Sequence, residues 1–92
     1  MIGSVRHKGL KRFIEADDRS KLPADMVERL RDILTVLSDA STIDDVALPS
    51  YRLHQLKGDL RGFYAITVRA NWRLIFRFED GEAFDLDFID YH

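Results

Sequence analysis

Residues 64–88 read YAITVRANWRLIFRFEDGEAFDLDF, and their alternation of apolar and polar side chains decides the fold class. A period of two is typical of strands that bury one face of a sheet. We predict three consecutive antiparallel strands, joined by three-residue turns that end at Asn71 and Gly81, because both residue types tolerate a left-handed backbone. One face of this meander is strongly apolar. It carries Tyr64, Ile66, Val68, Trp72, Leu74, Phe76, Phe78, Phe84, Leu86 and Phe88.

Helical spacing precedes this sheet. Residues 7–17 and 23–40 both repeat apolar side chains at three- and four-residue intervals. Pro23 suits the first turn of the second helix, because its missing N–H has no intrahelical partner there. Residues 2–6 could form a short opening strand. The layout therefore predicts an α+β fold, with two N-terminal helices packed on a mainly antiparallel sheet of four to five strands.

The length and composition favour one small domain, residues 1–92. The chain is 46% hydrophobic and has no cysteine, which excludes a disulfide framework, a thiolate zinc site and a cysteine nucleophile. Its three histidines lack metal-ligand spacing, and no phosphate-binding loop precedes a helix, so we expect neither metal nor cofactor. No apolar stretch is long enough to span a membrane and no signal peptide is visible, so we expect a cytoplasmic protein without membrane contact.

Opposite charges are segregated along the second half of the chain, although the net charge is only -2. Residues 51–78 carry six basic and one acidic side chain, whereas residues 79–92 carry six acidic and no basic ones. Two interpretations follow from this pattern. The strands pair the charges across their hairpins, or some of the cations face a polyanion.

The second face of the predicted sheet is expected to be open and polar. In this register Arg73 lies opposite Thr67 and Asp87, and Arg77 lies diagonally from Asp85, so part of the positive charge is offset within the sheet. Arg73 is the more interesting cation because it lies toward the strand ends. The face carries Phe63, Ala65, Thr67, Arg73, Ile75, Arg77, Asp85, Asp87, Ile89 and Tyr91.

Groups that move protons or neutralise charge gather in two stretches. His54 and Lys57 stand in a predicted strand that runs into a glycine turn, and the chain ends in Asp90, Tyr91 and His92. Such residues also occur on solvent-exposed surfaces that have no catalytic role. With an arginine on an open sheet face, however, they match the needs of metal-free RNA cleavage. One group takes the proton of the ribose 2′-OH, cations offset the phosphoryl charge, and an acid protonates the leaving 5′-oxygen.

Three segments closely resemble the HigB toxins, a branch of the RelE/ParE toxin superfamily: HQLKGD at 54–59, ITVRANWR at 66–73 and DYH at 90–92. The resemblance covers the whole chain and implies a RelE/ParE-like domain. It also implies a type II toxin that cleaves mRNA in the A site of the 70S ribosome. Its partner would be a HigA antitoxin, a helix-turn-helix protein that mediates any contact with DNA. Leu60 departs from the charged residue common after this Gly-Asp pair, which affects a surface contact rather than the chemistry.

The matching positions imply the catalytic roles. His54 and His92 exchange protons with the scissile nucleotide, and which of them is acid and which is base stays open. Lys57 and Arg73 stabilise the phosphoryl charge. The expected RNA-binding residues are Lys57, Arg69 and Arg73.

The end of the chain is expected to complete this set. Tyr91 stacks on a base or positions the ribose, and Asp90 orients His92 or the substrate. We expect the chain to stop at His92 because its last residues belong to the active site, which makes a C-terminal tag a risky change.

Two other functions remain open at this stage. A ParE-like toxin binds and inhibits DNA gyrase without catalysis, but that branch generally lacks the acid-base set found here. A plain RNA-binding module is disfavoured because the net charge of -2 gives little autonomous affinity for RNA.

Overall fold

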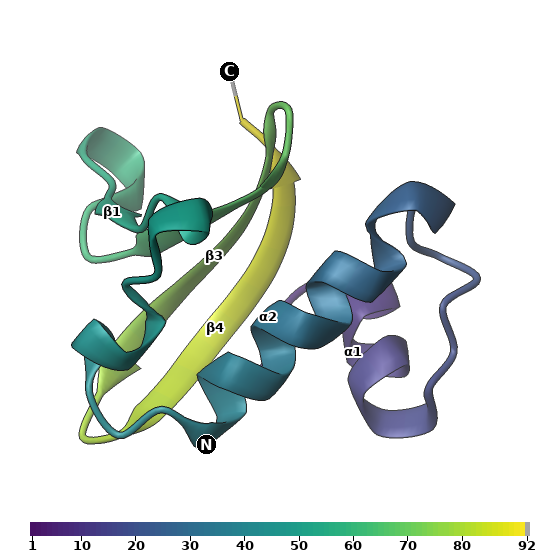
Figure 1. Ribbon diagram of the computed structural model, residues 1–92, viewed down its shortest axis with the longest axis horizontal. Coiled ribbons are helices and arrows are strands. Elements are labelled where there is room, and N and C mark those ends of the chain that lie inside the picture. Colours follow the sequence, from purple (N-terminus) through teal and green to yellow (C-terminus); the bar gives the residue numbers. More distant parts are fainter. Residues whose placement is uncertain (92) are drawn as a thin grey trace.

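The computed structural model describes residues 1–91, which form two α-helices and a four-stranded sheet. Neighbouring strands are antiparallel and follow the order β1-β2-β3-β4 (Figure 1). The helices are α1, Lys8–Ala16, and α2, Val27–Asp39. The strands are β1, His54–Gln55; β2, Tyr64–Arg69; β3, Trp72–Glu79; and β4, Glu82–Asp90. The short 3₁₀ turns are η1, Ala24–Met26; η2, Ile43–Val46; η3, Pro49–Tyr51; and η4, Gly58–Leu60.

Local signals set the ends of the helices. The His7 Nδ1 accepts a hydrogen bond from the Leu10 N–H at 3.0 Å and so caps the start of α1. The helix ends at Ala16, and Asp17 follows with a left-handed φ of 54°. The second helix was predicted over 23–40. Its α-helical part begins only at Val27, because the chain enters through the 3₁₀ turn η1. The two helices are otherwise where their apolar spacing predicted them.

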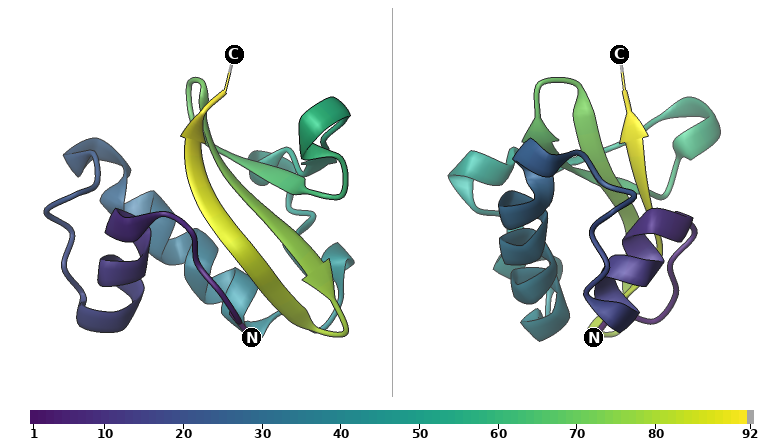
Figure 2. Two further views of the ribbon diagram at one scale, coloured as in Figure 1. Left: turned by 180° about the vertical axis from the view of Figure 1, so that it is seen from behind. Right: turned by 90° about the vertical axis from the view of Figure 1, so that its right-hand side faces the viewer.

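Both helices cover the same face of the sheet, which confirms the predicted layering (Figure 2). The core between them contains side chains that are almost inaccessible to solvent, including Leu10, Leu30, Ile33, Leu37, Ile66, Leu74, Phe76 and Leu86. Helix α2 contributes more to this core than α1, because five residues of α2 are buried and three of α1. No helix in residues 1–91 is long and apolar enough to cross a membrane.

The predicted opening strand at 2–6 is present only as two isolated parallel bridges. Ile2 pairs with Ala83 and Val5 pairs with Leu86, so the N-terminal segment runs along the outer edge of β4. The Gly3 N–H donates to the Ala83 carbonyl at 2.7 Å. The sheet is therefore mixed at this edge and antiparallel elsewhere.

The predicted three-residue turns are wrong, because the strand before each turn stays paired for one residue more than predicted. Arg69 pairs with Trp72 and Glu79 pairs with Glu82, which leaves two-residue turns. Asp80 and Gly81 both have a left-handed φ, of 52° and 77°. This is the conformation that a two-residue hairpin turn requires. In the first turn the left-handed residue is Ala70, with φ 51°, and not Asn71.

Two bulges shift the pairing within the two hairpins. One lies between Thr67 and Arg69 on β2, and the other shifts the pairing between Ile75 and Arg77 of β3. Asp85 of β4 lies opposite the second shift and has a left-handed φ of 54°, typical of a bulge residue. The prediction that Arg73 faces Asp87 is wrong, because the shorter β3–β4 turn and the bulge each move the pairing by one residue, and Arg73 lies opposite Ile89. On the other side the bulge in β2 offsets the shorter β2–β3 turn, so the predicted pairing of Arg73 with Thr67 is confirmed.

The prediction that the second face of the sheet is open and polar is wrong. Residues 53–63 fold over it, although only His54–Gln55 of the predicted strand pairs with β2. A second apolar cluster forms there, in which the four side chains Leu56, Phe63, Ala65 and Ile75 are at most 5% exposed. We call residues 53–63 the covering segment. It positions two of the candidate catalytic residues.

Candidate functional site

His54 stands at the start of the covering segment, opposite Ala65 of β2. Paired residues in antiparallel strands point to the same face, so the exposed His54 side chain lies on the face that carries the second apolar cluster. Its Nδ1 lies 3.0 Å from the Arg52 carbonyl oxygen. A carbonyl only accepts hydrogen bonds, so Nδ1 carries the proton when this bond forms. The Nε2 of a neutral His54 is then the free base.

Lys57 follows a buried anchor. The Leu56 side chain is 5% exposed, and its N–H donates to the Phe63 carbonyl at 2.9 Å. Lys57 itself is exposed and has an extended backbone just before η4. Gly58 follows with a positive φ of 67°, and nothing lies within 4 Å of the position where a Cβ would stand. The amine of Lys57 is thus carried on a loop that is fixed at one end and open on its outer side.

Arg73 is half-buried on β3 between Thr67 and Ile89. Its Nη1 donates to the carbonyl oxygens of Ala70 at 2.6 Å and Trp72 at 3.3 Å, so the guanidinium folds back over the β2–β3 turn. The Arg73 Nε is buried and has no hydrogen-bond partner among residues 1–91. A buried donor without a partner is costly, so the Arg73 Nε calls for a partner such as a bound water or a ligand oxygen.

The last described residues are tied to the same turn. The Tyr91 N–H donates to the Asn71 carbonyl at 2.8 Å, and the Tyr91 side chain is 38% exposed. Asp90 pairs with Trp72, so strand alternation places it on the helix-covered side, opposite to Ile89. His92 lies outside the described residues. The expectation that Asp90 orients His92 therefore stays a prediction.

The structure brings His54 and Arg73 onto one face of the sheet, and Tyr91 follows the end of β4 beside the β2–β3 turn. His54 and Arg73 are two strands and two residues apart, which corresponds to about 12 Å between their backbones. Figure 1 shows the end of β4 beside the β2–β3 turn, with the β1 region at the same end of the molecule. Arg69 is placed differently. It forms an ion pair of 2.6 Å with Asp25 of η1.

Sequence reasoning missed the second apolar cluster, which holds the candidate residues in place. Leu60 and Ile89 pack against the four buried side chains and close the cluster at its sides. A signal was present, since Leu56, Leu60 and Phe63 recur at four- and three-residue spacing in an otherwise polar stretch. This spacing is not that of a strand, and it indicates a segment that packs without pairing.

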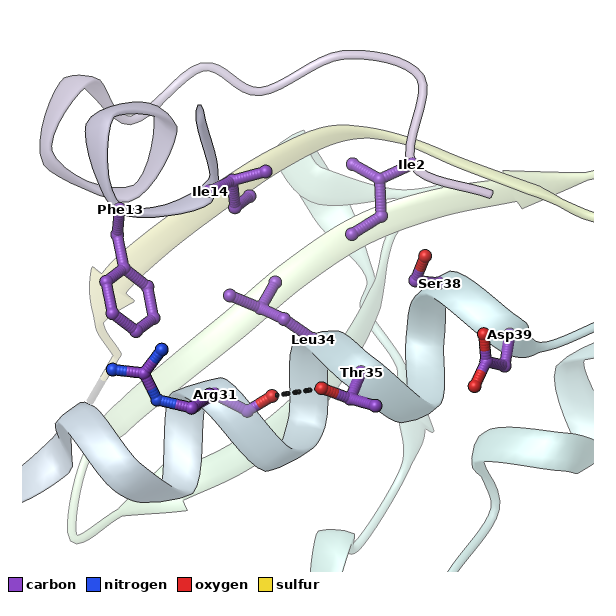
Figure 3. Close-up of a pocket in the computed structure, with 8 residues that line it drawn as sticks. All are labelled: Ile2, Phe13, Ile14, Arg31, Leu34, Thr35, Ser38 and Asp39. Atoms are coloured by element: carbon purple, nitrogen blue, oxygen red, sulfur yellow. Dashed lines mark hydrogen bonds between the residues drawn. The ribbon is translucent and has the colours of Figure 1, made fainter. Parts of the chain in front are cut away.

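A pocket of about 310 Å³ lies on the opposite, helical side of the molecule. Figure 3 shows Ile2, Ile14 and Leu34 around an apolar centre, with Arg31 and Asp39 at its rim. No candidate catalytic residue lines it. Among residues 1–91 no group of His, Asp or Glu side chains is arranged to hold a metal ion.

The sequence profile of one family, described as the RelE-like toxin of the type II toxin-antitoxin system HigB, matches residues 3–92. The chain belongs to this family. It is 46% identical over 92 residues to the Endoribonuclease HigB of Proteus vulgaris, covering 100% of both chains. It is 34% identical over 89 residues to the Toxin HigB-1 of Vibrio cholerae serotype O1, covering 95% of this chain and 93% of that relative.

The fold of this HigB-like toxin also occurs in a solved heterotetrameric complex of the YoeB-YefM toxin-antitoxin from Staphylococcus aureus. The TM-score is 0.64 at 16% sequence identity, over 100% of this chain and 95% of that chain. The helix pair over one face of an antiparallel sheet is therefore the RelE-like arrangement, as the resemblance had implied.

Proposed function

We propose that this HigB-like toxin is an endoribonuclease that cleaves mRNA bound in the A site of the ribosome, without a metal ion. The observation that carries the proposal is the common face of His54 and Arg73. It offers a free imidazole nitrogen and a half-buried cation about 12 Å apart along the sheet. The relation to an endoribonuclease over the full length of both chains supports the same activity.

The proposed reaction uses the nucleophile of the substrate. One histidine, His54 or His92, takes the proton of the ribose 2′-OH as its oxygen bonds to phosphorus, and the other protonates the 5′-oxygen as the P–O bond breaks. Lys57 and Arg73 offset the charge on the phosphoryl oxygens. The products are a 2′,3′-cyclic phosphate, which water can open to a 3′-phosphate, and a free 5′-OH.

Two further residues complete the proposed site. Tyr91, exposed at the end of β4, would stack on a base or position the ribose. Asp90 would orient His92 or the substrate. Lys57, Arg69 and Arg73 would contact RNA, and for Arg69 this requires that the phosphate compete with the Asp25 carboxylate. The three residues therefore differ in how accessible their charge is.

The family places the toxin in a type II toxin-antitoxin system, so its physiological inhibitor is an antitoxin. We propose a HigA-type antitoxin with a helix-turn-helix, through which alone the toxin would be brought to DNA. The chain would act as a single domain, residues 1–92, in the cytoplasm, where translating ribosomes are found.

The test is cleavage of a defined mRNA on purified 70S ribosomes, with wild type, His54→Ala and His92→Ala compared at equal folded concentration. We expect each variant to cleave at least about hundredfold more slowly. Naked mRNA should be cut poorly, because the net charge of -2 gives little affinity for free RNA. Wild-type rates for both variants, or inhibition of gyrase supercoiling with the mRNA left intact, would contradict the proposal.

A further inference from the structure

Two arginines from distant parts of the chain meet over one aromatic ring on the second face of the sheet. The guanidinium carbon of Arg77 lies 4.5 Å from the centre of the Phe63 ring, and that of Arg6 lies 5.4 Å from it. Both guanidinium groups also approach the same oxygen of Asp85, at 3.7 Å from the Arg77 Nε and 3.5 Å from the Arg6 Nη2. We call Arg6, Phe63, Arg77 and Asp85 the arginine pair site.

The backbone around this site is shaped to accommodate the two cations. Gly62 has a φ of 96°, and a Cβ at this position would stand 2.7 Å from the Arg77 Nη1. The close approach of the chain to the guanidinium therefore depends on glycine. On the other side Asp85 has the left-handed φ of the β4 bulge, and its N–H donates to the Ser4 Oγ at 2.8 Å. Arg77 is thus held between Phe63, Gly62 and Asp85.

Positive charge at the site exceeds negative charge. Two guanidinium groups share one carboxylate, and both ion-pair distances are longer than a hydrogen bond. Among the described residues neither Arg6 nor Arg77 donates a side-chain hydrogen bond, and their side chains are 54% and 39% exposed. Each guanidinium carries five N–H donors in a planar fork that suits phosphate oxygens. The site therefore offers many free donors and an uncompensated charge.

The site lies on the same face as the candidate catalytic residues. Arg73 and Arg77 are four residues apart on β3, which corresponds to about 13 Å along the strand. An RNA strand of a few nucleotides spans such a distance. The two positions would therefore contact different phosphates of one RNA, or the substrate and its surroundings on the ribosome.

We propose that Arg6 and Arg77 form a phosphate-binding subsite for RNA, separate from the residues that cleave it. This inference rests on the proposed function, from which RNA follows as the ligand. It adds to that function a second contact that holds the RNA away from the scissile bond. The phosphate belongs either to the mRNA or to ribosomal RNA, and both present the same chemistry to the arginine pair.

The alternative role is purely structural, in which the arginines only hold the covering segment and the N-terminal segment to the sheet. Asp85→Asn separates the two roles. Asparagine tolerates the left-handed backbone at this bulge, so the fold is retained. Removal of the carboxylate raises the net charge of the site, so a phosphate subsite binds RNA more tightly. A structural clamp would instead lose stability together with any RNA affinity.

The experiment measures binding of the full-length toxin to 70S ribosomes programmed with an mRNA that has a 2′-O-methyl group at the A-site codon and so cannot be cleaved. Affinity is measured across a range of salt concentrations for wild type, Arg6→Gln, Arg77→Gln and Asp85→Asn. The control is Arg19→Gln, which removes the same charge from the turn between α1 and α2. Urea unfolding of every variant accounts for effects on stability.

We expect Arg6→Gln to bind about fivefold more weakly at 0.1 M salt, with a salt slope lower by about 0.7, the value for one phosphate contact on a single strand. Arg77→Gln should show the same change, Arg19→Gln none, and Asp85→Asn tighter binding. If Arg6→Gln keeps the affinity and slope of Arg19→Gln, or if Asp85→Asn weakens binding, the subsite is refuted.

Neutral methylphosphonate linkages at single mRNA positions distinguish the two sources of the phosphate. An effect of Arg6→Gln that vanishes with one neutral linkage identifies that mRNA phosphate, and an effect that survives all of them identifies ribosomal RNA. Both results support the subsite. Cleavage of the unmodified mRNA by wild type is measured in parallel, so a toxin that binds through Arg6 without cleaving would refute the proposed function alone.

Discussion

Shortening Leu56 to alanine should reduce activity far more than it reduces the folded population. Leu56 is 5% exposed and lies in the second apolar cluster, between His54 and Lys57 of the same covering segment. Its loss would leave a cavity under the segment and release both candidate catalytic residues from their positions. The prediction therefore tests the covering segment and the proposed chemistry together.

The magnitude follows from the burial of the side chain. Leu→Ala changes in cores cost about 2–5 kcal/mol, and we expect about 2–3 kcal/mol here, because the cluster has only four buried members and borders solvent. A domain of this size is stable by about 5–10 kcal/mol. At least about 2 kcal/mol would remain, so more than nine-tenths of the Leu56→Ala protein stays folded. Cleavage of ribosome-bound mRNA should nevertheless fall at least about tenfold.

Leu34→Ala is the matched control. Leu34 is 8% exposed and belongs to the core under the helices, so it should lose a similar free energy of unfolding in urea while its cleavage rate stays within about twofold of wild type. Both variants are compared at equal folded concentration in single-turnover reactions. If Leu56→Ala cleaves as fast as Leu34→Ala, the covering segment does not position catalytic groups and our reasoning is wrong.

Three smaller changes test other contacts. Arg73→Lys keeps the charge but loses the planar guanidinium, whose Nη1 donates to two carbonyl oxygens, so single-turnover cleavage should fall about hundredfold, and an unchanged rate would argue against a role in the chemistry. Thr42→Ala removes the hydroxyl half of the capping box with Asp45, while the Thr42 N–H still donates to the Asp45 carboxylate, and should cost about 1 kcal/mol in urea unfolding. Hydrogen bonds from Ser20 lower the pKa of Asp18 from 3.8 to about 2, so this carboxylate stabilises the fold above pH 3.8 and the effect is lost as the pH falls toward 2. The free energy of unfolding of Asp18→Asn should therefore fall less than that of wild type as the pH is lowered from 3.8 toward 2. Identical acid unfolding curves would count against the prediction.

The sequence predicted those parts of the fold that depend on local periodicity. The alternation around Leu74 and Phe76 correctly indicated an antiparallel meander with its apolar face under two helices. The pairing of Arg73 with Thr67 and the proximity of Arg77 to Asp85 were also predicted correctly. These features follow from side chains that lie near one another along the chain or directly across a hairpin.

The features that the sequence did not predict depend on contacts between distant residues. A bulge such as that at Asp85 inserts one residue without changing the apolar pattern visibly, yet together with the shorter β3–β4 turn it moves the partner of Arg73 from Asp87 to Ile89. The covering segment is held by packing of Leu56 against Ile75 and its neighbours rather than by a periodic pattern. The candidate site residues were thus named one by one from the sequence, and their catalytic roles stay predictions, whereas the surface that carries them was not predicted.

The bridges of the N-terminal segment to β4 have a consequence for the order of folding. Gly3 donates to Ala83 and Arg6 donates to Leu86, so the first residues of the chain find their partners only after nearly all of it has been made. Contacts of such long sequence separation form slowly, because a large loop must close before they stabilise anything. We therefore expect a nascent toxin to stay incomplete while its last strand is inside the exit tunnel of the ribosome that synthesises it. Under the proposed function, the translating ribosome would thus release the toxin before the toxin can fold and act on it.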